Sequence, residues 1–133
     1  MSDIGFDGQV AVVTGAGHGL GREHAVQLAA RGARVVVNDL GGAVDGSGSD
    51  AGPAQTVVDE ITGAGGEAVA DTNSVATKEG GEAIVQTALD AFGRVDIVVN
   101  NAGILRDKAF HNLTPELLDS VLQVHLYLSL IHI

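Results

Sequence analysis

Residues 10–28, VAVVTGAGHGLGREHAVQL, decide the fold. Four apolar or small residues at the start of this stretch run straight into a group of closely spaced glycines. An apolar run bounded by glycine is typical of a strand that is buried on both faces. Beyond Gly21, the apolar residues Ala25, Leu28 and Ala29 follow the i, i+3, i+4 spacing of a helix. The stretch therefore predicts a strand, a glycine-rich turn and a helix in immediate succession.

The glycine-rich turn has the spacing of a site for a phosphate group. Gly15 permits a tight turn, Gly19 lets the backbone approach a pyrophosphate, and Gly21 lets the helix pack against the strand. The unpaired N–H groups and the positive dipole end of the helix, around Leu20, then face the anion. From this stretch alone, the alternative is a flexible turn in a chain rich in small residues.

Composition limits the classes of protein to consider. The 133 residues are enough for one domain with a real core, and 45% hydrophobic against 18% charged residues indicates a globular chain. A net charge of −10 argues against nucleic-acid and anionic-membrane partners, which need clustered Lys and Arg. There is no cysteine, so no disulfide or thiolate metal site is possible, and no metal is expected. The N-terminus lacks the pattern of a secretory signal, and we expect a cytoplasmic protein.

The rest of the chain continues the alternation of strands and helices. Apolar runs predict further strands at residues 33–37, 67–70 and 95–99. Amphipathic segments predict helices that begin at Pro53, span 80–92 and begin at Pro115. The helix over 80–92 is expected to bury Ile84, Ala88, Leu89 and Phe92, and Thr114 is expected to cap the last helix. Residues 41–52, rich in Gly, Ser and Asp, predict a mobile loop.

This order of elements predicts an α/β fold with a doubly wound parallel sheet of the Rossmann type. Short apolar strands without alternation are typical of a sheet covered by helices on both faces. Right-handed crossovers would place the strands in the order 3-2-1-4, with a crevice between the first and the fourth. We expect this dinucleotide-binding domain over residues 1–126, truncated after about four strands.

Asp39 follows the second predicted strand and lies eighteen residues beyond Gly21. An acidic side chain about 20 residues beyond the glycine turn binds the ribose hydroxyls of NAD in this kind of fold. A carboxylate at this place also repels the 2′-phosphate of NADP, and no Lys or Arg occurs between Arg34 and Lys78 to attract it. The sequence therefore predicts NAD as the cofactor. The alternative is that Asp39 only opens the following loop.

These motifs together resemble the short-chain dehydrogenase/reductase family over residues 6–126. Thr14-Gly15-x-x-x-Gly19-x-Gly21 is similar to the family's cofactor turn, and Asn100-Asn101-Ala102-Gly103 is similar to its motif after the fourth strand. The resemblance implies an NAD-dependent oxidoreductase that interconverts a secondary alcohol and a ketone. It also implies that Asn73, Ser74 and Val75 border the adenine and that Asn101 meets the ribose on the nicotinamide side.

A narrower resemblance concerns the substrate. The segments VVNDLGG at 36–42, NAGILRD at 101–107 and VHL at 124–126 are similar to the (3R)-hydroxyacyl-CoA dehydrogenase part of multifunctional β-oxidation enzymes. This implies an acyl-CoA thioester substrate, a parent protein that is a homo-oligomer, and a catalytic role for His125, where the family usually carries Asn. The alternative for His125 is an ordinary polar group buried in a helix. The alternatives for function are a 3-oxoacyl-carrier-protein reductase, another alcohol dehydrogenase, or a catalytically dead nucleotide-binding module.

The Tyr-x-x-x-Lys pair that transfers the proton in this family is absent from the chain. The single tyrosine, Tyr127, is followed four residues later by Ile131, and no lysine follows Lys108. The resemblance stops after Leu126, and we expect residues 127–133 to be a non-native tail on an N-terminal fragment; the alternative is a natural amphiphilic helix end.

The 133-residue chain is accordingly expected to show no dehydrogenase turnover. Loss of general acid–base catalysis alone removes a factor of roughly 10²–10⁴ in rate. The measurement is NADH formation from NAD and a 3-hydroxyacyl-CoA. Turnover by the purified chain would contradict the expectation.

Overall fold

The structure, a computed structural model, describes residues 4–41 and 52–126. Four parallel strands form one sheet: β1 (Val10–Thr14), β2 (Arg34–Asn38), β3 (Glu67–Asp71) and β4 (Ile97–Val99). The strand order is β3-β2-β1-β4, which confirms the predicted order. The predicted loop lies almost wholly outside the described residues, as does the expected tail.

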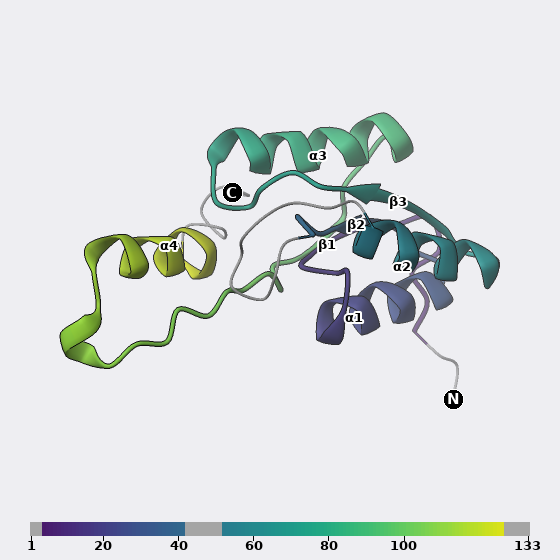
Figure 1. Cartoon of the computed structure of the whole chain (residues 1–133). Coiled ribbons are helices and arrows are strands. Elements are labelled where there is room, and N and C mark those ends of the chain that lie inside the picture. The colour runs from purple at the N-terminus through teal and green to yellow at the C-terminus, as the bar shows by residue number, and fades with distance from the viewer. Residues whose placement is uncertain (1–3, 42–51, 127–133) are drawn as a thin grey trace.

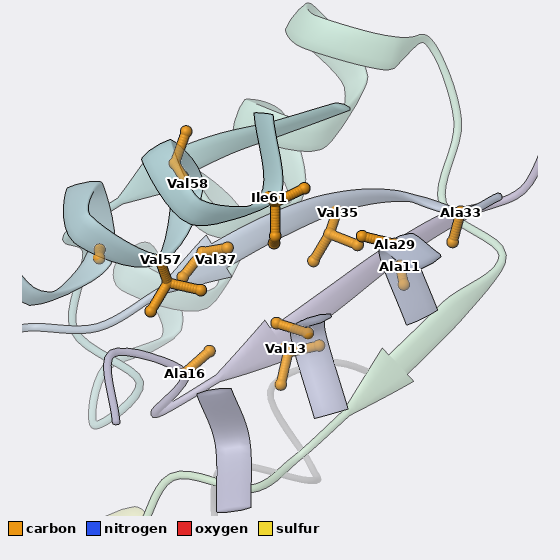
Figure 2. Packing of buried hydrophobic residues seen from close by; sticks show 12 residues of the cluster. Ala11, Val13, Ala16, Ala29, Ala33, Val35, Val37, Val57, Val58 and Ile61 are labelled. Carbon is orange, nitrogen blue, oxygen red and sulfur yellow. The ribbon is translucent and has the colours of Figure 1, made fainter. Parts of the chain in front are cut away.

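Three helices cover the sheet, two on one face and one on the other. They are α1 (Gly19–Ala30), α2 (Gly52–Gly63) and α3 (Lys78–Phe92). Neighbouring residues of β1 point to opposite faces: Ala11 and Val13 pack with α1 and α2, whereas Val10 and Val12 pack with α3. Figure 2 shows the first cluster, in which side chains of α2 lie over β2. Both faces are therefore apolar, which explains the lack of alternation in the sequence and confirms the doubly wound fold.

The last helix, α4 (Pro115–His125), stands apart from this core (Figure 1). A long connection that contains one turn of 3₁₀ helix, η1 (Phe110–Asn112), leads to it; the sequence did not predict η1. Thr114 caps α4 by accepting a hydrogen bond from the Leu117 N–H, as predicted, and Pro115 occupies the first turn. In α4 only Val124 is buried.

Two predicted details of α3 and β4 are wrong. Leu89 is 42% exposed, because the buried face of α3 is formed by Ile84 and Ala88, closer to the centre of the sheet. β4 begins at Ile97 rather than at 95. The side chain of Asp96, the residue before β4, accepts a hydrogen bond from the first residue of β1.

Asp96 ties the entrance of β4 to that of β1. Its Oδ2 accepts hydrogen bonds from the Val10 N–H at 2.8 Å and from Nε of Arg94 at 2.9 Å, and its Oδ1 pairs with Arg94 at 2.6 Å. The Arg94 guanidinium, followed by the Val10 N–H, holds the pKa of Asp96 below its usual value. Ionised Asp96 is thus favoured by the folded state.

We predict that Asp96→Asn lowers the melting temperature at pH 7 and removes part of the acid sensitivity. A depressed pKa gives stability that is present above the unfolded value, about 4, and is lost as pH falls through the folded value. The test is a set of thermal melts from pH 7 to pH 3. The control is Asp90→Asn. In the unmodified chain, the Asp90 carboxylate accepts a hydrogen bond from Gln86 on the surface of α3. Parallel pH profiles for Asp96→Asn and the unmodified chain would contradict the assignment.

Candidate functional site

A cavity of about 590 Å³ opens at the carboxyl ends of the strands. Its walls come from the turn after β1, the segments after β2, β3 and β4, and the last turns of α4. Six of the nine predicted cofactor residues line it: Gly15, Asp39, Asn73, Ser74, Val75 and Asn101. His125 lines it too, whereas Gly19, Leu20 and Gly21 do not.

The glycine turn has the backbone that the sequence predicted. Gly15 has a φ of +63° and Gly19 a φ of +61°, a region that favours glycine. A Cβ on Gly21 would lie 2.3 Å from the carbonyl oxygen of Gly15 and 2.4 Å from Nδ2 of Asn101. Gly19 has open space around it, because nothing lies within 4 Å of its ideal Cβ position. Gly21 is thus in tight contact with the turn, and the space beside Gly19 is open.

Asp39 is held in the wall of the cavity by backbone donors. It is 8% exposed, and its Oδ2 accepts from the Gly17 N–H at 2.9 Å while Oδ1 accepts from the Gly41 N–H at 2.8 Å. Each carboxylate oxygen can accept more than one hydrogen bond, so both retain capacity for ligand hydroxyls. The sequence alone indicated no role for Gly17. In the structure a Cβ at this position would lie 2.7 Å from Oδ2 of Asp39, so the close approach of the carboxylate requires glycine.

Thr14 and Asn101 join the ends of β1 and β4. Buried Oγ1 of Thr14 accepts from the N–H groups of Asn101 and Ala102, both at 3.1 Å. Nδ2 of Asn101 donates to the carbonyls of Thr14 and Gly15, again at 3.1 Å. The Asn101 amide thus braces the glycine turn, and its contact with a ribose stays a prediction. Thr14 is a site residue that the sequence marked only as part of a motif.

The segment after β3 depends on another glycine that the sequence did not single out. Oγ of Ser74 accepts from the Ala76 N–H at 3.1 Å, which shapes the loop. A Cβ on Gly80, in the first turn of α3, would lie 1.8 Å from the carbonyl oxygen of Ser74. The loop that carries Asn73, Ser74 and Val75 therefore packs directly against the backbone of Gly80, where a side chain would not fit.

His125, the last residue of α4, faces the segment after β4. Its Nε2 lies 3.1 Å from the Ile104 nitrogen and 3.0 Å from the Ile104 oxygen; it accepts from the former or donates to the latter according to its tautomer. A Cβ on Gly103 would lie 2.8 Å from Cε1 of the ring. The residue is exposed, so its interpretation as a buried helix group is wrong.

Residues 4–41 and 52–126 contain no cluster of three or more His, Asp or Glu side chains that could hold a metal ion. Within the same ranges, no helix is both long and apolar enough to cross a membrane.

The parallel sheet, the glycine turn and the carboxylate in the cavity wall are typical of the doubly wound α/β class of domain. The chain belongs to the short-chain dehydrogenase family, whose family model matches residues 9–132. Proteins of this family use a nicotinamide cofactor.

Individual relatives support this membership. A protein of Mycobacterium tuberculosis named as a short-chain type dehydrogenase/reductase is 58% identical over 92% of this chain and 43% of its own length. The peroxisomal multifunctional enzyme type 2 of Drosophila melanogaster is 58% identical over 91% of this chain and 20% of that enzyme. A crystal structure of a short chain dehydrogenase from Mycobacterium avium has a TM-score of 0.85 and 53% identity, over 95% of this chain and 45% of that one. The chain thus spans less than half the length of these relatives.

Two more distant solved structures carry different cofactors. A metagenomic short-chain oxidoreductase in complex with NADP is 34% identical, with a TM-score of 0.82 over 95% of this chain and 53% of that one. A 7α-hydroxysteroid dehydrogenase complexed with NADH is 33% identical, with a TM-score of 0.85 over 96% of this chain and 46% of that one.

We predict that Gly21→Ala destabilises the fold by roughly 1–3 kcal/mol, the usual cost of overpacking a tight contact. The added methyl would meet the Gly15 carbonyl and the Asn101 amide, neither of which can move without disturbing the junction of β1 and β4. Chemical denaturation followed by circular dichroism measures the change. The control is Gly63→Ala at the end of α2, where nothing lies within 4 Å of the new methyl. Equal stability of the two variants would contradict the packing role.

Proposed function

We propose that this chain is the cofactor-binding part of an NAD-dependent oxidoreductase that interconverts a secondary alcohol and a ketone. The observation that carries the proposal is Asp39, a buried carboxylate with both oxygens anchored, in the wall of the cavity. A negative charge at this place favours two ribose hydroxyls and disfavours a 2′-phosphate. Bound NAD would accept a hydride from the alcohol carbon.

The residues present fit each part of NAD. The free space beside Gly19 and the start of α1 suit the pyrophosphate, because the first N–H groups of a helix attract anions. Asn73 would accept a hydrogen bond from the adenine amino group, beside Ser74 and Val75. Asn101 would meet the ribose of the nicotinamide half, while its amide nitrogen holds the turn.

His125 would act at the substrate end of the cavity, opposite the adenine segment. Its Nε2 is engaged by the backbone of Ile104, so Nδ1 is the ring atom that could hold a proton for the substrate or for a water. We propose a 3-hydroxyacyl-CoA and 3-oxoacyl-CoA couple as substrates of the longer protein, which we expect to be a homo-oligomer. The similarity to a peroxisomal multifunctional enzyme supports the acyl-CoA assignment.

A nucleotide-binding module without turnover is the second candidate. The anchored Asp39 and the open space beside Gly19 favour it, because they account for nucleotide binding and require no turnover. Binding of NAD without formation of NADH from a 3-hydroxyacyl-CoA would distinguish this candidate from an enzyme. The sequence predicts the cytoplasm as its compartment. Several relatives are named as peroxisomal, so localisation of a tagged chain would test that prediction.

We predict that the chain binds NAD more tightly than NADP and that Asp39→Ala narrows the difference. Loss of hydrogen bonds to a charged acceptor weakens the binding of NAD by roughly tenfold or more. Loss of the negative charge at the same time favours the binding of NADP, which carries the 2′-phosphate. Calorimetric titration with both dinucleotides measures the ratio. Asp90→Ala on α3, outside the cavity, is the matched control. Equal affinity of the unmodified chain for NAD and NADP would overturn the cofactor assignment.

A further inference from the structure

A second buried carboxylate, Asp71, lies behind the wall of the cavity at the end of β3. It is 5% exposed and does not itself line the cavity. Its Oδ1 accepts from Nδ2 of Asn38 at 2.7 Å and from the Asn73 N–H at 2.9 Å. Its Oδ2 accepts from Nδ2 of Asn73 at 2.8 Å and from Oγ1 of Thr87 at 2.7 Å. Asp71 therefore gathers four donors from β2, α3 and the segment that follows β3.

This arrangement decides which way the side-chain amide of Asn73 faces. A carboxylate only accepts hydrogen bonds, so the amide must turn its NH₂ group toward Asp71. The backbone N–H of Asn73 binds the same carboxylate, so the residue is held at two points. Oδ1 of Asn73 has no hydrogen-bond partner within the described parts of the chain, and the residue lines the cavity. Oδ1 of Asn73 is thus available to a ligand as an acceptor, whereas its NH₂ group is already bonded to Asp71.

We propose that Asp71 is a positioning residue that fixes the Asn73 amide as an acceptor and thereby selects a 6-aminopurine over a 6-oxopurine. This inference rests on the proposed function, because it deepens the recognition of the base of the cofactor. Adenine carries an amino group at C6, which donates to the oxygen of Asn73. Hypoxanthine carries a carbonyl oxygen there, which faces the same acceptor without a hydrogen bond. The selectivity comes from a residue that does not touch the ligand.

Asp71→Asn is the variant that separates this role from simple support of the fold. The new amide can keep its oxygen toward Asn38 and the Asn73 N–H, but it places an NH₂ group where Oδ2 was. Two NH₂ groups then face each other, and the Asn73 amide rotates to present its oxygen to position 71. Its NH₂ group turns to the cavity, where it suits hypoxanthine instead of adenine.

The double variant Asp71→Asn with Asn73→Asp provides the rescue. The amide at position 71 can donate to the carboxylate at position 73 and also to Oγ1 of Thr87, whose hydroxyl then donates to the Ala83 carbonyl 3.0 Å away. The carboxylate at position 73 has acceptors only, so it again offers an acceptor to the cavity. We expect the double variant to recover the preference for adenine.

The experiment compares AMP with IMP, which differ at the C6 edge of the base, on the purified 133-residue chain and both variants. Titration calorimetry gives the dissociation constants, reduced nicotinamide mononucleotide serves as a ligand without the base, and circular dichroism checks the fold. We expect the unmodified chain to prefer AMP by about tenfold, the value of one hydrogen bond of about 1.4 kcal/mol. Asp71→Asn should lower the AMP/IMP preference by about tenfold or reverse it, and leave binding of the mononucleotide unchanged.

The outcomes separate the two proposals. No binding of NAD or AMP by the folded, unmodified chain would refute the proposed function and this inference with it. Binding of NAD together with equal affinity for AMP and IMP would refute only the inference. The inference would also be refuted if Asp71→Asn keeps the preference for AMP over IMP, or if it weakens the binding of AMP and of IMP equally. If Asp71→Asn does not fold, the double variant decides: recovery of the fold and the AMP preference supports the pairing, and failure to recover them overturns it.

Discussion

The site depends on one close contact between backbones that leaves no room for a Cβ at Gly21. At this point the first turn of α1 meets the Gly15 carbonyl, and the Asn101 amide is packed into the same corner. The contact fixes where α1 begins relative to β1, and Asn101 transmits the same constraint to β4. Thr14 completes the junction by accepting two N–H groups from the segment after β4. The turn, the start of α1 and this part of the cavity wall are therefore joined by direct contacts.

Within residues 4–41 and 52–126, the two buried carboxylates of the site form hydrogen bonds but no salt bridge. Asp39 is satisfied by two backbone N–H groups, and Asp71 by side-chain amides, a hydroxyl and a backbone N–H. Hydrogen-bond donors of this kind compensate the hydration that a carboxylate loses on burial. In a chain of net charge −10, these local hydrogen-bond donors therefore matter more for the two buried carboxylates than the overall charge does.

The helix α4 contributes to the cavity although it adds little to the core. Only Val124 of this helix is buried, yet four residues of its second half line the cavity: Ser120, Gln123, Val124 and His125. The ring of His125 is oriented by the backbone of Ile104, in the segment after β4, rather than by packing in α4. The end of the cavity at His125 is thus positioned by loop contacts, and the end at Asn73 by a buried hydrogen-bond network.

The sequence by itself determined the strand order, the two-sided burial of the sheet and the glycine-rich turn between β1 and α1. Each of these depends on local spacing of apolar residues and glycines, which a single chain displays directly. Only the tertiary structure decided how the polar residues divide their hydrogen bonds. Gly17 and Gly80 gave no signal because their importance lies in neighbours 22 and six residues away, Asp39 and Ser74. The sequence did not indicate a role for Asp71, because this residue lies behind the wall of the cavity. The hydrogen-bond partners of a buried carboxylate depend on how strands and helices meet in space, which the sequence does not display.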